Sequence, residues 1–247
     1  MIELKSDFHL HTCDDLKDYV GHTGFELIDC AAQRGFKALA ITNHDLFTFN
    51  NDLKSYASDH DILLIPGIEK KIAGKHVLLL NAFPATEKIE TFDDLYYAKK
   101  DGLFVIAPHP FFKARTCLGR KLINEIELFD AIEYCFFYSK LFNLNRRAVR
   151  VSRKVGLPLI GNSDCHLLEY MGVCHSMIAV EEKSMESVFS AIRNNSVNVV
   201  SRPIFLPKLP MLLVEMNQKR RKLSERKRQE LTLPAFEFGK ELEEVSM

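Results

Sequence analysis

The sequence predicts an α/β fold, on two observations. Short apolar runs alternate with segments of helical period over most of the 247 residues, which is the pattern of parallel strands joined by crossover helices. Gly35, Gly102 and Gly156 each follow a helical segment and precede an apolar run, where a glycine that ends a helix belongs. The chain length fits one large domain or one domain with an appendage.

The expected strands are apolar runs bounded by polar or glycine-containing segments. In chain order they cover residues 2–9, 38–42, 62–68, 76–81, 103–107, 131–135, 157–161, 177–180 and 197–200. The expected helices are segments in which apolar residues recur at helical spacing. They cover residues 24–34, 51–59, 92–100, 140–154 and 185–194. This alternation is the reason for expecting parallel pairing.

The character of the chain changes near Ser201. The segment RPIFLPKLP (202–210) holds three prolines in nine residues, and proline breaks both helices and strand ladders. We therefore expect a main domain over residues 1–205 and a C-terminal helical tail over residues 206–247, basic first and then acidic. A solvated helix is the simpler interpretation of the tail, and a contact surface for nucleic acid or another partner is the alternative.

Composition excludes several classes of protein. The 33 basic residues balance the 33 acidic ones, which disfavours binding to nucleic acid or membranes through overall charge. The hydrophobic content of 47% argues against disorder. The N-terminus, MIELKSDFHLH, lacks the apolar core of a signal peptide, and no long apolar stretch predicts a membrane segment. Six cysteines without a CxxC pair indicate reduced thiols, so we expect a cytoplasmic protein.

Histidines and carboxylates lie at the ends of the expected strands. In chain order these are His9 and His11, His44 and Asp45, Glu69, His109, and Asp164 with His166. Parallel barrels carry catalytic groups at the carboxyl ends of their strands, because the strands converge there. Five strand ends therefore deliver metal-binding side chains to one rim. His76 begins a strand instead, and we expect a hairpin to bring it to the Glu69 strand.

Five short motifs carry a resemblance to a known family. They are DFHLHT (7–12), ITNHD (41–45), PGIE (66–69), APHP (107–110) and GNSDCH (161–166). In this order and spacing they resemble the four-motif signature of the polymerase and histidinol phosphatase (PHP) family, over residues 1–205. The resemblance implies a distorted (β/α)7 barrel, similar to a TIM barrel, with a three-metal site that acts on phosphate esters.

The resemblance implies nine metal ligands. They are His9, His11, Asp15, His44, Glu69, His76, His109, Asp164 and His166. The acidic residue after the first motif departs from the common form, in which serine precedes the aspartate and glycine follows it. The segment CDDLKD offers Asp14, Asp15 and Asp18 instead, of which we choose Asp15, with Asp18 as the alternative. Asp7 and Asp45 adjoin ligand histidines and are interpreted as residues that support the ligands.

The ligand set indicates the metals and the chemistry. Imidazoles and carboxylates without thiolates favour three divalent ions of Zn, Mn or Fe. Three such ions, three carboxylates and a hydroxide leave a net charge of about +2, which suits a phosphate dianion. Metal coordination lowers the pKa of water and supplies hydroxide at neutral pH for attack on phosphorus, so no serine or cysteine nucleophile is needed.

Two further residues are expected to act on the substrate. Arg115, in the loop after APHP, is the best cation to hold phosphate oxygens, because its guanidinium matches a phosphate edge. PHP phosphoesterases often place an arginine there, and Lys113 and Arg120 compete for the role. His22 is expected to protonate the leaving group, with His175 as the alternative.

These expectations together predict a metal-dependent phosphoesterase or phosphatase. Its substrate would be a phosphate ester of a small molecule, a nucleotide or an oligonucleotide. The alternative is a PHP-type binding or regulatory module without turnover, which the presence of every motif histidine disfavours. An amidohydrolase barrel also opens with HxH, but it would need a metal-bridging lysine at a later strand end, and no expected strand ends in one.

Overall fold

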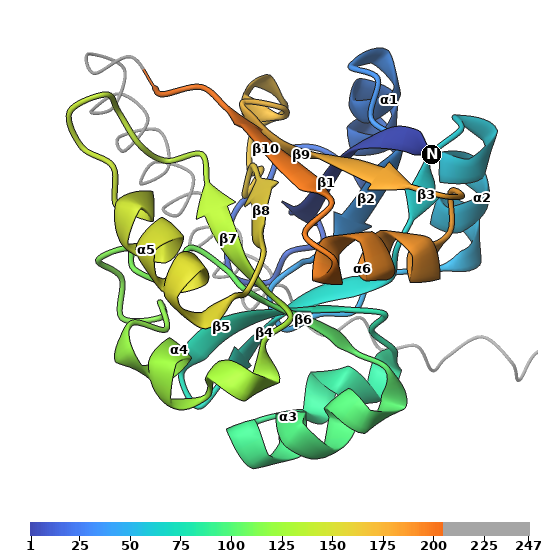
Figure 1. The fold of residues 1–247 in the computed structure, drawn as a ribbon. Coiled ribbons are helices and arrows are strands. Elements are labelled where there is room, and N and C mark those ends of the chain that lie inside the picture. Colours follow the sequence, from blue (N-terminus) through green and yellow to red (C-terminus); the bar gives the residue numbers. More distant parts are fainter. Residues whose placement is uncertain (205–247) are drawn as a thin grey trace, which may run out of the picture.

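The structure, a computed structural model, describes residues 1–204. They form a mixed α/β fold, which confirms the predicted fold class (Figure 1). The helical, basic tail expected over residues 206–247 lies outside the described residues, as does the end of the domain expected over residues 1–205. No helix of residues 1–204 combines the length and apolar character needed to cross a bilayer.

Strands in residues 1–204 form two five-stranded sheets. They are β1 (Ile2–Leu10), β2 (Ala38–Ile41), β3 (Leu63–Leu64), β4 (Gly67–Ile72), β5 (Lys75–Leu80), β6 (Phe104–Ala107), β7 (Ala131–Cys135), β8 (Leu159–Asn162), β9 (Cys174–Val180) and β10 (Val197–Ser201). The first sheet has the order β10-β9-β1-β2-β3, and the second has the order β4-β5-β6-β7-β8. Parallel pairing joins β1 to β2, β2 to β3, β6 to β7 and β7 to β8.

The other strand pairs are antiparallel, so the expectation of parallel pairing is wrong for them. Strands β4 and β5 show the reason. Only Ala73 and Gly74 connect them, both with positive φ (46° and 77°), and so short a connection can join only antiparallel strands. The predicted hairpin between the strands of Glu69 and His76 is therefore confirmed.

The two sheets touch at isolated bridges rather than closing into a barrel of continuous ladders within residues 1–204. One bridge pairs Leu10 with Cys165, and the other pairs His44 with Glu69. Strand β3 is two residues long, so the ladder that starts at β2 ends before it reaches β4. Residues 1–204 thus form the expected mixed α/β fold, with two linked sheets, but no closed (β/α)7 barrel is seen in them.

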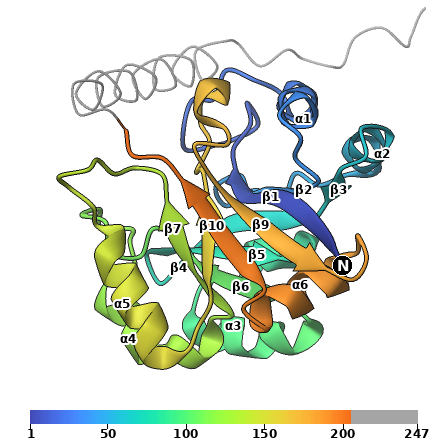
Figure 2. The same ribbon diagram turned by 45° about the horizontal axis from the view of Figure 1, so that its top comes forward.

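Helices cover the outside of the sheets. They are α1 (Gly24–Gln33), α2 (Asn51–Asp59), α3 (Phe92–Ala98), α4 (Arg120–Asn124), α5 (Asn145–Val155) and α6 (Met185–Arg193). Helices α1 and α2 lie together near β3, whereas α4 and α5 lie on the other side of the fold, near β7 (Figure 2). A capping box of Thr23 and Glu26 starts α1. Gly35, Gly102 and Gly156 have φ values of 74°, 92° and 76°, as their predicted place after helices requires.

The boundaries of several elements differ from the predicted ones, and two of the differences have a local cause. The expected strand over residues 62–68 is split into β3 and β4 around Pro66, which has no N–H to donate to a ladder. Helix α5 begins at Asn145 instead of residue 140, and the side chain of Asn143 accepts a hydrogen bond from the Asn145 amide at this start. The short helix α4 was not predicted.

Buried apolar side chains from both sheets form a shared core. Phe8, Leu78, Phe104 and Ile160 of β1, β5, β6 and β8 are 0% exposed and belong to one cluster. Phe189 of α6 stacks on Phe104 with ring centroids 4.5 Å apart. Because these strands pack against common neighbours, their carboxyl ends are held at fixed positions, and the polar residues that follow them are fixed as well.

Candidate metal centre

Five histidines direct a ring nitrogen at the carboxylate of Glu69, which lies in β4 and is 1% exposed. The distances to Glu69 Oε2 are 3.2 Å from His9 Nε2, 3.4 Å from His11 Nε2 and 2.9 Å from His44 Nε2. The distances to Glu69 Oε1 are 2.8 Å from His76 Nδ1 and 3.4 Å from His109 Nε2. Each oxygen of one carboxylate therefore faces a different group of histidines, so Glu69 would be able to contribute to more than one cation position.

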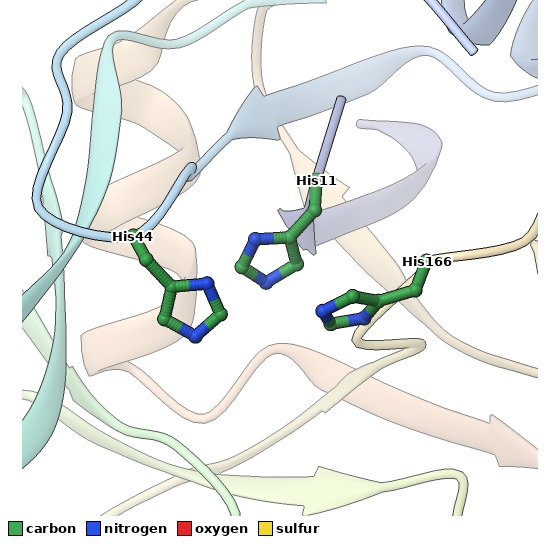
Figure 3. Close-up of side chains that lie close together, drawn as sticks. All are labelled: His11, His44 and His166. Carbon is green, nitrogen blue, oxygen red and sulfur yellow. The ribbon is translucent and has the colours of Figure 1, made fainter. Parts of the chain in front are cut away.

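Asp164 and His166 complete the cluster from the segment after β8. Asp164 Oδ1 lies 3.4 Å from His9 Nε2 and 3.4 Å from His11 Nε2. The His166 ring stacks on the His11 ring with centroids 4.3 Å apart. Figure 3 shows His11, His44 and His166 arriving from different segments and turning their rings toward one another. The structure thus brings together eight of the nine ligands that the motif resemblance implied, all except Asp15.

Several polar atoms of this cluster are buried and make no hydrogen bond of acceptable geometry. They are His9 Nε2, His11 Nε2, His76 Nδ1, His166 Nε2, Glu69 Oε1 and Glu69 Oε2. Burying a polar group without a partner costs several kcal/mol, roughly 1–3 in protein mutants, so native proteins rarely leave such atoms unsatisfied. Six of them around one small space mark a place where a cation would supply the missing partner.

The donor atoms form four overlapping groups, in each of which they lie within 4.8 Å of one another. The groups are His11, His44 and His166; His9, Glu69 and His109; His9, His11 and Asp164; and His44, Glu69 and His76. All donors are imidazole nitrogens or carboxylate oxygens, a set that fits borderline divalent ions such as Zn²⁺, Mn²⁺ and Fe²⁺. The residues present therefore fit the divalent metals that the sequence predicted.

Asp15 occupies a different position from the predicted one. Its Oδ2 atom lies 2.8 Å from Nδ1 of His11 and 2.8 Å from Nδ1 of His44, on the side of each ring opposite Glu69. Burial raises the pKa of Asp15, but the hydrogen bonds from both histidines outweigh burial and hold the pKa below its usual value. Asp15 belongs to none of the four donor groups. It orients two rings from behind, and its role as a metal ligand stays a prediction.

Asp18, the alternative, lies on the open side of the cluster. Its Oδ2 atom is 3.3 Å from His166 Nε2, and the residue lines the adjoining cavity. Asp14 and Asp18 are four positions apart, and only the path of the loop after β1 decides which carboxylate reaches the cluster. That loop turns at Asp15, whose Oδ1 accepts hydrogen bonds from the amides of Lys17 and Asp18.

Sequence reasoning missed Glu133, which is 0% exposed in β7. Its Oε1 atom lies 2.8 Å from His9 Nδ1 and accepts a hydrogen bond from Asn162 Nδ2 at 3.0 Å. Its Oε2 atom accepts a hydrogen bond from the backbone amide of His109 at 2.6 Å. Glu133 therefore fixes two candidate ligands at once. The available signal was an acidic residue in the middle of an apolar strand, AIEYC.

Two aspartates interpreted as supporting residues do support the ligands. Asp7 accepts hydrogen bonds from the backbone amide of His9 and from the Ser163 hydroxyl, and so ties β1 to the segment after β8. Asp45 accepts hydrogen bonds from Lys70 Nζ at 3.0 Å and from the Lys71 amide at 2.9 Å, and so ties the end of β2 to β4.

The backbone is strained where ligands follow strands. Asp45, His109 and Asp164 have φ values of 54°, 29° and 47°, in a region that residues other than glycine seldom adopt. Such conformations persist where the surrounding contacts impose them, and they concentrate at functional sites. Here they redirect the chain at the ends of β2, β6 and β8.

Mutual electrostatics favour the ionised form of Glu69 and the protonated form of His9. Burial raises the pKa of Glu69, but the charges of His44 and His9 outweigh burial and lower the pKa well below its usual value. Burial lowers the pKa of His9, but Asp164, Glu133 and Glu69 outweigh burial and raise the pKa well above its usual value. Bound cations would supply the positive charge that the imidazole protons otherwise provide to the buried carboxylates.

A cavity of about 250 Å³ opens beside the cluster. On one side it is lined by Asp18, His44, Glu69, His76, His109, Asp164 and His166. Its other lining residues are Phe112, Ala114, Thr116, Cys117, Cys135, Phe136, Phe137, Leu167 and Tyr170. The candidate ligands thus border a space that can admit a small molecule.

Neither residue predicted to act on the substrate lines this cavity. Arg115 is exposed, and its carbonyl oxygen accepts a hydrogen bond from Lys75 Nζ at 2.7 Å. The competing Lys113 and Arg120 are exposed as well and do not line the cavity. The role of Arg115 in phosphate binding stays a prediction, since position in a loop does not determine where a side chain points.

His22 lies in the loop after β1 and is not among the residues that line the cavity. It is 6% exposed, and its Nε2 atom donates a hydrogen bond to the carbonyl oxygen of His11 at 2.9 Å. The Cys13 amide donates to the His22 carbonyl oxygen at 2.7 Å, so His22 braces the loop after β1. The alternative, His175, lies on β9 with its ring 5.9 Å from that of Phe36 and does not line the cavity.

Comparisons with known proteins agree with this fold. A PHP-associated family model matches residues 143–197, a segment that includes Asp164 and His166. A two-domain protein from Bacteroides vulgatus, containing a predicted PHP-like metal-dependent phosphoesterase, is similar with a TM-score of 0.63 and 19% identity, over 81% of this chain and 65% of that one. No curated protein matches the sequence.

Two other solved structures share the fold. PsfC from Pseudomonas syringae has a TM-score of 0.61 and 17% identity, over 90% of this chain and 100% of that one. The lesion-specific endonuclease PfuEndoQ from Pyrococcus furiosus has a TM-score of 0.58 and 14% identity, over 80% of this chain and 58% of that one. The chain therefore spans about two thirds of the Bacteroides protein and less of the Pyrococcus endonuclease. The family-model match over residues 143–197 and the PHP-like fold of these structures agree with the resemblance to the PHP family that the sequence motifs carry.

Proposed function

We propose that this protein is a metal-dependent phosphoesterase that hydrolyses a phosphate ester. The observation that carries the proposal is the convergence of buried, unpartnered donor atoms from His9, His11, His76, His166 and Glu69 on the edge of a cavity. Three divalent ions of Zn, Mn or Fe are proposed to bind there. When bound, such ions activate water for attack on phosphorus and neutralise the oxygens of the phosphoryl group.

The chain would hold these ions through His9, His11, Asp18, His44, Glu69, His76, His109, Asp164 and His166. This set replaces Asp15 by Asp18, because Asp18 lies on the cavity side of His166. Asp15 and Glu133 would act behind the ligands: each binds the Nδ1 side of a histidine and so directs the Nε2 atom toward the cluster. Partners of this kind fix the tautomer and the orientation of metal-binding histidines.

The substrate's phosphoryl group would be held mainly by the ions. No lysine or arginine is among the described residues that line the cavity, so the described part of the chain supplies no cation of its own to the phosphate there. The Pyrococcus endonuclease, and a related endonuclease Q structure with a 27-mer duplex substrate, make nucleic acids or nucleotides candidate substrates beside phosphorylated small molecules. The non-catalytic module is the weaker alternative, because no motif histidine has been lost.

The test combines elemental analysis of the purified protein with assays of phosphomonoesters and phosphodiesters in the presence of Zn²⁺, Mn²⁺ or Fe²⁺. The proposal expects bound divalent metal and hydrolysis of at least one class of ester, both abolished in His11→Ala. A metal-loaded wild-type protein that hydrolyses neither class but binds nucleic acid or protein tightly would establish the module instead.

A further inference from the structure

The wall of the cavity away from the candidate ligands is aromatic. Phe112, Phe136, Phe137 and Tyr170 line it. They come from the segments that follow β6, β7 and β8, three neighbouring strands of the second sheet. The same strand ends that position His109, Glu133 and Asp164 therefore also position an apolar surface.

The aromatic rings form a continuous series that begins beside a candidate ligand. The ring centroids of His109 and Phe112 lie 6.4 Å apart, and those of Phe112 and Phe137 lie 6.5 Å apart. Phe136 lies 5.9 Å from Phe137 and 5.9 Å from Tyr170. These separations lie within the range of interacting aromatic pairs.

This aromatic wall, defined by Phe112, Phe136, Phe137 and Tyr170, is backed by buried residues. Phe136 is 7% exposed and belongs to one cluster with Cys135, Cys174 and Ile204, against which the other three rings pack. A supported wall keeps its shape before a ligand arrives, so a ring that binds to it loses little free energy to reorganisation of the protein.

Charge divides the cavity into two unlike halves. The metal side carries Asp18, Glu69 and Asp164, whose charges the cations would offset. The aromatic side carries no charged residue, and no Lys or Arg is among the residues of 1–204 that line any part of the cavity. A second anionic group on the substrate would therefore lose water at the aromatic wall without gaining a cation, which is unfavourable.

The size of the cavity limits what can occupy both halves. Its volume of about 250 Å³ lies just below the range of roughly 300–1,000 Å³ that is typical of small-molecule sites. That space suits a phosphoryl group together with one ring system.

We propose that the substrate is a phosphate monoester whose alcohol part carries a flat aromatic ring and no second anionic group. The phosphoryl group lies at the candidate ligands, and the ring packs against Phe112 and Phe137. This inference rests on the proposed function, because it names the substrate class of the same site.

Binding of non-hydrolysable analogues to the metal-loaded, full-length protein tests the inference apart from turnover. The probes are benzylphosphonic acid, 2-methylpropylphosphonic acid and 4-carboxybenzylphosphonic acid, measured by isothermal titration calorimetry. The benzyl compound is expected to bind roughly three- to tenfold more tightly than the branched alkyl one, as aromatic packing predicts. The added carboxylate is expected to weaken binding about tenfold or more, because it has no cation to pair with.

Variants of the wall provide the structural control. Phe112→Ala and Phe137→Ala are each expected to remove most of the preference for the benzyl compound and to leave binding of the alkyl compound within about twofold. Phe142→Ala is the matched control, because Phe142 lies in the same loop as Phe137 but is 67% exposed and does not line the cavity. Equal affinities for the benzyl and alkyl compounds in the wild type, or tightest binding of the carboxylate compound, would overturn the inference.

Turnover separates the inference from the proposed function. Benzyl phosphate and 2-methylpropyl phosphate both release a primary alcohol. A difference between their kcat/KM values therefore reflects contacts in the cavity more than the reactivity of the leaving group. Hydrolysis of both with a several-fold higher kcat/KM for benzyl phosphate supports the inference and the function. Hydrolysis of both at equal kcat/KM refutes the inference alone. Absence of hydrolysis together with preferred binding of benzylphosphonic acid refutes the function and leaves a selective binding site.

Discussion

Glu133 Oε1 and His9 Nδ1 lie 2.8 Å apart, and both side chains are completely buried. This contact holds a proton on His9 Nδ1 and turns Nε2 toward Glu69, 3.2 Å away. Because Glu133 also holds the backbone amide of His109, one carboxylate orients ligands from two strands.

We expect Glu133→Ala to weaken metal binding by roughly 10- to 100-fold, as the loss of such a partner typically does. Competition with a chromophoric chelator measures the affinity. Glu127→Ala, which changes an exposed glutamate, is the control and is expected to bind metal like the wild type. Unchanged affinity in Glu133→Ala would show that His9 is oriented without this contact.

Replacing Asp15 and replacing Asp18, both in the loop after β1, should affect stability differently. Asp15→Ala is expected to destabilise the metal-free protein by roughly 2–4 kcal/mol, because it leaves two buried histidines and three backbone amides without their acceptor. Asp18→Ala is expected to change that stability by less than about 1 kcal/mol, because Asp18 lies at the partly open cavity.

Both variants are expected to bind metal more weakly. Urea denaturation in the presence of a chelator gives the stabilities, and elemental analysis gives the metal content. Full metal content in Asp18→Ala would remove Asp18 from the proposed ligands, and similar stabilities of the two variants would contradict the separation of their roles.

Metal removal should lower the melting temperature. A ligand at 100 times its Kd stabilises the folded state by about 2.7 kcal/mol. For a chain of this size that corresponds to a decrease of roughly 5–10 °C on chelation.

Readdition of Zn²⁺ or Mn²⁺ should restore the melting temperature, as followed by circular dichroism. His60→Ala should respond like the wild type, since His60 contacts Tyr56 and Asp29 away from the cluster. A chelator that leaves the wild-type melting temperature unchanged would argue against a structural contribution of the ions.

Asp7 should make the stability of the metal-free protein depend on pH. Burial raises its pKa to about 7 from the ordinary value of 3.8, despite hydrogen bonds from Ser163 and His9. Because the pKa of Asp7 is higher in the folded state than in the unfolded state, protonated Asp7 adds to the free energy of unfolding. That contribution is fully present below about pH 4 and is lost as the pH rises through about 7. Asp7→Asn carries no such group.

The wild type should therefore lose stability relative to Asp7→Asn between about pH 4 and pH 8, whatever the offset between the two at low pH. Urea denaturation of both proteins in chelator at several pH values measures the difference. Parallel stability curves would show that Asp7 does not titrate in this range.

The order of elements and the gathering of the motif histidines could be predicted from the sequence. Short apolar runs predict strands because buried strands need apolar side chains. His9, His44 and His109 each lie at or after the end of such a run. Because the strands share a core, they bring these histidines together. The His76 hairpin could also be expected, because so little chain separates it from Glu69.

Only the tertiary structure decided which polar groups face the cluster and which stand behind it. Asp15 and Asp18 are three residues apart in one loop, yet the first binds the far side of two rings and the second lines the cavity. Glu133 acts on His9 from 124 positions away, and Arg115 points to solvent. The spacing of residues along the chain fixes the type of each element, whereas the direction of a side chain depends on contacts between strands and loops that are distant in the sequence.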